Sequence, residues 1–122
     1  MTGDASDGTA DDSVTAPKPA SAFTDFDLPD ALQATLSREG LIEPTPIQKM
    51  SIPVLLSGED LIGLAQTGTG KTAAFLLPML TRLSYTPAVR AGQSPKALVL
   101  APTRELANQI STNLSRLARD MN

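Results

Sequence analysis

Ala65-Gln66-Thr67-Gly68-Thr69-Gly70-Lys71-Thr72 is the stretch of this 122-residue chain that decides its fold. A loop that holds a polyphosphate needs backbone N–H groups that point inward, and glycine permits that backbone path because it has no Cβ. Gly68 and Gly70 supply these permissive positions. Lys71 is suited to place its ammonium group on the β- and γ-phosphates, and the hydroxyl of Thr72 is suited to ligate Mg²⁺. The stretch therefore predicts a phosphate-binding loop.

The segments on either side of this loop fit a nucleotide site. Residues 60–65 have the pattern of a short buried strand, and residues 73–77 open an apolar helix. The N-terminal dipole of such a helix favours an anion, and strand, loop and helix together are the context that the motif requires. The general pattern has glycine at the first position, where this chain has Ala65. The alternative is a glycine-rich turn that happens to precede Lys71 and Thr72.

Residues 40–48 predict the end of one helix and the start of the next. Gly40 suits a left-handed cap at a helix C-terminus. Thr45 suits an N-cap, and Pro46 suits the first helical position. The amide of Gln48 offers a donor and an acceptor side by side, which complement N6 and N7 of adenine. The alternative is that Gln48 is simply solvated, as most glutamines are.

Residues 101–107 predict a third functional segment. They follow the apolar run 97–100, which reads as a second buried strand, and they precede a helix. In open α/β sheets ligands bind beyond the C-terminal ends of the strands. A hydroxyl, a guanidinium and a free helix N-terminus suit the phosphate oxygens of a nucleic-acid backbone, so the candidate contacts are Pro102, Thr103 and Arg104. The alternative is an N-capped helix on which Arg104 is solvated.

In their order and spacing, these three segments resemble the motifs of the DEAD-box family of ATP-dependent RNA helicases, within helicase superfamily 2. Residues 40–48 look like the Q motif of that family. Residues 65–72 look like its motif I, in which alanine commonly replaces the first glycine. Residues 102–107 look like its motif Ia. The resemblance covers residues 23–122.

The same family has an aromatic residue upstream of the Q motif, where it packs on the adenine ring. Phe23 is the match in this chain, and Phe26 is the near alternative. The chain departs from the family at Leu41 and Ile42, where the Q motif usually has an aromatic and then a charged residue. We expect the adenine contacts to survive this change, with different packing beneath them.

The resemblance implies an α/β fold, a partial RecA-like P-loop NTPase domain with an incomplete parallel sheet. It implies ATP and Mg²⁺ as ligands and RNA as a partner, held by sequence-independent contacts to its backbone. The residues that match the nucleotide-binding positions of the family are Phe23, Thr45, Gln48, Thr67, Gly68, Thr69, Gly70, Lys71 and Thr72. Those with an implied catalytic role are Lys71 and Thr72, with Thr72 as the Mg²⁺ ligand. Those that match its nucleic-acid contacts are Pro102, Thr103 and Arg104.

The sequence lacks the other motifs of this family. It contains no Asp-Glu-Ala-Asp, no Ser-Ala-Thr that follows it, and no second RecA-like domain. We therefore expect a truncated or partial helicase, inactive as an isolated 122-residue chain and not stable alone. Two alternatives are a non-catalytic truncated product that binds nucleotide weakly and a fragment of a superfamily 2 DNA helicase. The discriminating observation is whether the reading frame continues into an Asp-Glu-Ala-Asp motif.

Composition divides the chain into a tail and a body. Residues 1–22 have a net charge of −3 and almost no large apolar residue, so we expect a disordered acidic tail. Residues 23–49 form the Q-motif region, and residues 50–122 form the N-terminal part of an ATP-binding domain. The charges of residues 23–122 cancel, so any RNA contact must be local. The absence of cysteine and histidine argues against disulfides and zinc. No apolar stretch reaches membrane-spanning length and no signal peptide is evident, so we expect no membrane partner and a cytoplasmic location.

Four helices are expected along the body. The first runs from about Pro29 to Glu39. The second starts at Thr45, and Pro53 should break or restart it. The third runs from the loop to about Leu83, with a bend expected at Pro78. The last follows residue 103, with these apolar residues on one face: Leu106, Ile110, Leu114 and Leu117.

Overall fold

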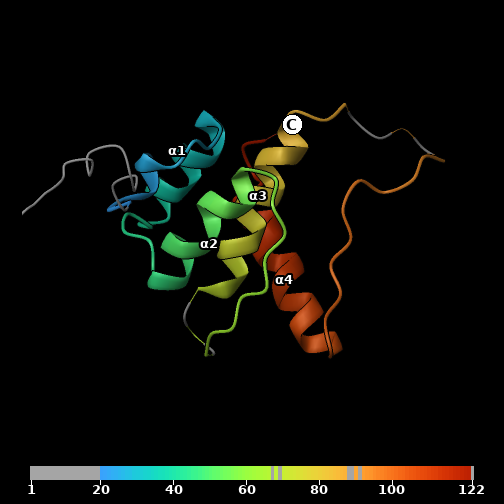
Figure 1. The fold of residues 1–122 in the computed structure, drawn as a ribbon. Helices are drawn as coiled ribbons and strands as arrows, with labels where there is room; N and C mark the ends of the chain where they lie inside the picture. Colours follow the sequence, from blue (N-terminus) through green and yellow to red (C-terminus); the bar gives the residue numbers. More distant parts are fainter. Residues whose placement is uncertain (1–19, 67, 69, 88–89, 91, 122) are drawn as a thin grey trace, which may run out of the picture.

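The computed structural model describes residues 20–66, 68, 70–87, 90 and 92–121. Within these residues it contains a short 3₁₀ turn and four α-helices (Figure 1). Their bounds are η2 Phe23–Asp25, α1 Asp30–Arg38, α2 Pro46–Leu56, α3 Lys71–Ser84 and α4 Arg104–Leu117. No helix in the described ranges is long and apolar enough to cross a bilayer.

Helix α1 (Asp30–Arg38) ends as the sequence predicted. Gly40 has a φ of 76°, the left-handed conformation that glycine adopts without strain. The N–H of Gly40 donates to the carbonyl of Ser37 at 3.1 Å, and the N–H of Leu41 donates to that of Leu36 at 2.8 Å. These two bonds form a Schellman motif, which satisfies two of the last carbonyls of the helix. Gly40 therefore sets the point at which the chain turns toward α2.

Helix α2 (Pro46–Leu56) begins with the predicted N-cap Thr45 and with Pro46 at its first position. It then continues through Pro53, so the prediction that this proline breaks or restarts the helix was wrong. A proline removes one backbone hydrogen bond, but packing compensates here, because Ile52 is fully buried and α2 packs along α3. Proline 53 itself lies on the exposed side.

Helices α3 (Lys71–Ser84) and α4 (Arg104–Leu117) complete the core. Helix α3 packs against both α2 and α4. It runs without interruption past the buried Pro78. The predicted apolar face of α4 is confirmed: Ile110 and Leu117 are buried, and Leu106 and Leu114 pack against the same core. The core consists of Phe23, Phe26, Leu28, Leu32, Leu36, Ile52, Leu76, Leu77, Leu80, Ile110 and Leu117.

The predicted parallel sheet is not formed among the described residues. Residues 60–65 and 97–101 are irregular chain without strand pairing (Figure 1). Several of their apolar side chains face solvent, with exposed fractions of 89% at Ile62 and 84% at Leu100, whereas Ala101 packs against the core. A strand needs a neighbour for its N–H and C=O groups, whereas a helix satisfies them within its own segment. The helices therefore form in this structure, and the sheet stays a prediction.

The predicted tail, 1–22, lies mostly outside the described residues. Its last three residues are described. The carboxylate of Asp25 accepts hydrogen bonds from the N–H groups of Ser21, at 2.9 Å, and Ala22, at 3.1 Å. Ala20 packs against the core. The ordered body therefore begins a few residues earlier than the predicted boundary.

Candidate nucleotide and nucleic-acid sites

The phosphate-binding loop meets the first turn of α3. Gly68 and Gly70 both adopt positive φ angles, 83° and 86°, so both occupy the conformation for which the sequence analysis required glycine. Gly70 is the N-cap of α3, and Lys71 is the first helical residue, with an exposed side chain. Helix α3 has 14 residues, so its N-terminus offers free N–H groups and a favourable dipole to an anion. Predicted contacts Thr67 and Thr69 lie outside the described residues.

Gln48 connects the start of α2 to this loop. Its side chain is only 6% exposed, which excludes the alternative that it is simply solvated. Its Oε1 accepts a hydrogen bond from the N–H of Thr45 at 2.8 Å, which completes a capping box at the start of α2. Its Nε2 donates to the carbonyl oxygen of Gly70 at 3.1 Å. Two predicted nucleotide-binding segments, distant in sequence, are thereby joined.

The loop borders a cavity of about 840 Å³. Its lining includes Gln48, Gly68, Gly70, Lys71 and Thr72, together with apolar side chains of α2, α3 and α4. The volume lies within the range of small-molecule sites. A cationic side chain, two glycines in left-handed conformation and a helix N-terminus at its edge fit a nucleoside polyphosphate. No cluster of three or more acidic, histidine or cysteine side chains that could hold a metal exists in the described part of the chain. Thr72, the predicted Mg²⁺ ligand, is among the residues that line the cavity.

Phe23 lies in the core. Its ring is 3% exposed and packs edge to face on Phe26, with 6.0 Å between the ring centroids. Its N–H donates to the carbonyl of Ile42 at 2.9 Å, and its own carbonyl accepts from Nε2 of Gln33, also at 2.9 Å. Phe23 does not line the cavity beside the loop. In this structure the backbone of Phe23 is hydrogen-bonded to the segment that precedes α2.

The segment before α4 has a different position. Pro102, Thr103 and Arg104 are exposed, and none of them lines the cavity beside the phosphate-binding loop. Thr103 is the N-cap of α4, since its Oγ1 accepts a hydrogen bond from the N–H of Leu106 at 3.1 Å. Its hydroxyl hydrogen is not used in that bond. The N-capped-helix interpretation is therefore confirmed for Thr103, and it leaves the segment available to a second ligand.

Comparison with known proteins identifies the family. The model of the DEAD/DEAH box helicase family matches residues 45–122, more than half of the chain. The chain belongs to the DEAD/DEAH box helicase family.

Individual DEAD-box relatives agree with this assignment. DEAD-box ATP-dependent RNA helicase 20 of Oryza sativa subsp. japonica is 45% identical over 100 residues, which cover 82% of this chain and 20% of that protein. Pre-mRNA-splicing ATP-dependent RNA helicase PRP28 of Pyricularia oryzae is 44% identical over 108 residues, which cover 86% of this chain and 16% of that protein. The chain thus spans a fifth or less of the length of these curated relatives.

Solved DEAD-box structures resemble the fold. The RNA helicase Prp28 from Chaetomium thermophilum, bound to ADP, matches 88% of this chain with a TM-score of 0.78 and 42% identity. A DEAD box protein from Methanococcus jannaschii matches 82% with a TM-score of 0.70 and 32% identity. The match covers 26% of each solved chain. The likeness assigns this chain to part of a DEAD-box RecA-like domain.

One feature of this DEAD-box site was missed by the sequence analysis. The bond between Gln48 and Gly70 was not expected, although Gln48 was singled out for another role. A signal for its inward orientation exists in the sequence. Thr45-x-x-Gln48 is a capping box, which draws the glutamine back along the start of its own helix. The partner across the site, Gly70, depends on how α2 packs against α3, and no local pattern predicts that.

Proposed function

We propose that this chain is the nucleotide-binding part of an ATP-dependent RNA helicase. It binds ATP with Mg²⁺ at the phosphate-binding loop and the backbone of RNA at the segment before α4. One observation carries the proposal: the amide of Gln48 is held against Gly70 of the loop, at 3.1 Å. A group able to recognise a base and a loop able to hold phosphates are thereby adjacent. The curated relatives are named ATP-dependent RNA helicases, which supports the same function.

The phosphates of ATP would lie at the loop. Left-handed Gly68 and Gly70 turn the backbone so that its N–H groups can converge on an anion. The ammonium of Lys71, exposed at the first position of α3, would pair with the β- and γ-phosphates. Thr67 and Thr69, predicted from the same motif, belong to the proposed site as well. Thr72 would hold Mg²⁺, which, when bound, neutralises charge on these phosphates.

The adenine base would be recognised by Gln48. A glutamine amide has two N–H donors and an oxygen with two acceptor lone pairs. The bonds to Thr45 and Gly70 use one donor and one lone pair. One donor and one lone pair remain for N6 and N7 of adenine. Stacking of Phe23 on the base, which the family resemblance implies, would require its ring to leave the packing on Phe26.

RNA would contact the start of α4. The guanidinium of Arg104 and the hydroxyl hydrogen of Thr103 can both donate to phosphate oxygens. Both residues are exposed, and so is the preceding Pro102. Such contacts carry no base recognition. They suit a protein that grips RNA by its backbone.

The test of the nucleotide site is an equilibrium titration of the chain with ATP and GTP in the presence of Mg²⁺. We expect tighter binding of ATP than of GTP. Lys71→Ala should weaken ATP binding by about 2–3 kcal/mol, because a charge-assisted contact to phosphate is lost. The matched control is Lys96→Ala, which removes the same charge from an exposed lysine that does not line the loop cavity. Equal affinity for ATP and GTP would contradict the role of Gln48 in base recognition, and an unaffected Lys71→Ala variant would contradict the phosphate site.

A further inference from the structure

We propose that residues 97–101 form an interface between two copies of this chain. Each copy supplies the segment as one β-strand, and the two strands pair in antiparallel fashion about a twofold axis at Val99. The inference does not rest on the proposed function, since the pairing needs neither ATP nor RNA. The backbone of the segment, its side chains and its ends each favour such a pair.

The backbone of residues 97–101 has no partner within the described part of the chain. None of its N–H and C=O groups forms a hydrogen bond there. Unpaired backbone groups along an apolar segment are a template for a further strand. A helix could not satisfy them, because its own backbone groups are already bonded to one another. The partner that fits this backbone is therefore another extended segment.

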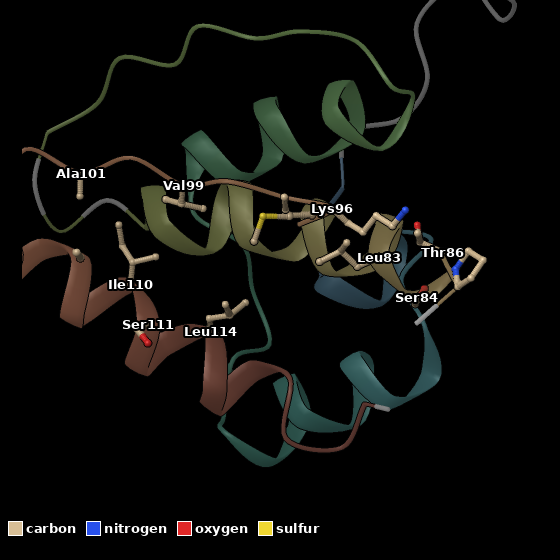
Figure 2. A pocket seen from close by; sticks show the side chains of 13 residues that line it. Leu83, Ser84, Thr86, Lys96, Val99, Ala101, Ile110, Ser111 and Leu114 are labelled. Atoms are coloured by element: carbon tan, nitrogen blue, oxygen red, sulfur yellow. The ribbon is translucent and has the colours of Figure 1, made fainter. Parts of the chain in front are cut away.

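The side chains of the segment alternate as in a β-strand. Those of Ala97, Val99 and Ala101 line the groove between α3 and α4 (Figure 2). Those of Leu98 and Leu100 do not line it, and they are 79% and 84% exposed. A period of two is typical of a strand with two distinct faces. One face of the segment therefore points toward the helices, and the other presents two leucines to solvent.

A second copy of the same segment matches this exposed face. In an antiparallel pair centred on Val99, Leu98 of one copy lies opposite Leu100 of the other, and the same contact recurs across the axis. Such cross-strand pairs of apolar side chains stabilise a sheet. A twofold axis closes a self-complementary interface, so the product is a dimer. The charges of residues 23–122 cancel, so the bodies of two copies carry no net charge that would oppose their approach.

The ends of the segment fix the register of the pair. Pro102 has no N–H, so it cannot continue the ladder of hydrogen bonds, and Lys96 is charged and exposed. In the register centred on Val99, these two residues lie opposite each other just beyond the paired segment. A shift along the strand would bring one of them among the apolar pairs. The other exposed apolar segment, residues 60–65, is less suited to pairing, because Gly63 lies within it and glycine weakens a strand.

The first test is analytical ultracentrifugation of the purified chain over a range of concentrations. We expect a monomer–dimer equilibrium for the parent chain. Leu98→Lys should raise the dissociation constant of the dimer by about a hundredfold or more, because one leucine is lost from the interface in each copy. Ile62→Lys is the matched control: it places the same charge on an 89% exposed residue of the other apolar segment, and it should leave the dimer intact. A parent chain that stays monomeric, or equal losses in the two variants, would overturn the inference.

The second test measures the register by disulfide cross-linking, which is possible because the sequence contains no cysteine. Across the proposed axis residue 99 lies opposite itself, whereas residue 98 lies diagonally from its own copy, roughly 7–8 Å away. A disulfide needs Cβ atoms about 3.5–4.5 Å apart. Under mild oxidation Val99→Cys should therefore form a covalent dimer and Leu98→Cys should form little, although Leu98 is the more exposed side chain. Faster cross-linking of Leu98→Cys than of Val99→Cys would indicate random collision and would overturn the proposed pairing.

Discussion

At residue 48 a single side-chain amide forms hydrogen bonds with two parts of the chain, the N–H of Thr45 and the carbonyl of Gly70. Two of its four hydrogen-bonding positions are used in the bonds to Thr45 and Gly70, and the proposed function assigns the other two to a base. The sequence predicted that Gln48 lies at the start of a helix, because the N-cap Thr45 and Pro46 are local signals. The contact with Gly70 could not be predicted, since it joins residues that are 22 positions apart. Phe23 illustrates the same limit: the sequence predicts an aromatic at the right spacing but not that its ring lies in the core.

Arg104 provides a prediction at this scale. Arg104→Ala should weaken a single-stranded RNA and should reduce the dependence of the logarithm of affinity on the logarithm of salt concentration by about one unit, because one phosphate contact is removed. The measurement is fluorescence anisotropy with a labelled RNA at several salt concentrations, and with DNA of the same sequence. Arg119→Ala, which changes an exposed arginine beyond the end of α4, is the control. Equal losses in the two variants would show that the contact is not local to the start of α4.

At the scale of elements, local sequence signals predicted where the helices lie, but they do not determine how strands pair in a sheet. Caps, prolines and apolar spacing marked both ends of α1 and the starts of α2 and α4 to within one or two residues. Pro53 was the exception, since its local signal was overruled by the packing of Ile52 on the core. Strands depend on neighbours that are not local, so the apolar patterns of residues 60–65 and 97–101 do not identify the segments with which they would pair.

A groove between α3 and α4 shows where apolar packing is incomplete. Its volume is about 750 Å³, and its lining includes Met79, Leu83, Val99, Ile110 and Leu114. Figure 2 shows Val99 and Ala101 of the second predicted strand on one side of it, and Ile110 and Leu114 of α4 on the other. The apolar face of α4 is thus only partly covered.

Helix α1 and the chain after α4 are joined by a polar link that gives a pH-dependent prediction. Nη2 of Arg38 lies 2.6 Å from Oδ2 of Asp120, and this bond lowers the pKa of Asp120 below its ordinary value of 3.8. A hydroxyl hydrogen bond with Thr35, 3.2 Å away, acts in the same direction. A carboxyl whose pKa is lowered by folding stabilises the fold above its unfolded pKa, and this contribution is lost as the pH falls through the folded pKa.

We therefore expect Asp120→Asn to lower the melting temperature slightly at neutral pH, since Asp120 is well exposed and exposed ion pairs contribute little. The difference from the parent should shrink as the pH falls below the ordinary aspartate value. Thermal melts followed by circular dichroism over this pH range would measure it. A difference that stays constant across the range would show that the ionised carboxylate is not what stabilises this link.

At the scale of the whole molecule, the sequence contains the predicted phosphate-binding loop and contains no Asp-Glu-Ala-Asp motif. P-loop enzymes use an acidic residue near the Mg²⁺ and an arginine finger for hydrolysis. The arginine finger alone raises the rate of hydrolysis by roughly 10³–10⁵. We expect no RNA-stimulated ATP hydrolysis by the 122-residue chain. A phosphate-release assay with purified protein, with and without RNA, checks this. Multiple turnovers that disappear in Lys71→Ala would show that the chain contains a complete catalytic site.

The most direct test of the account is a map of where ATP binds. In a ¹⁵N–¹H correlation experiment on the chain, Mg-ATP should shift the backbone resonances of Gly68, Gly70, Lys71 and Thr72 most strongly, together with the side-chain amide of Gln48. The same titration of Lys71→Ala should shift them only at far higher ATP concentrations. Shifts centred on the groove between α3 and α4, or a loop that does not respond in the parent chain, would contradict the central claim that this loop and Gln48 form an ATP site.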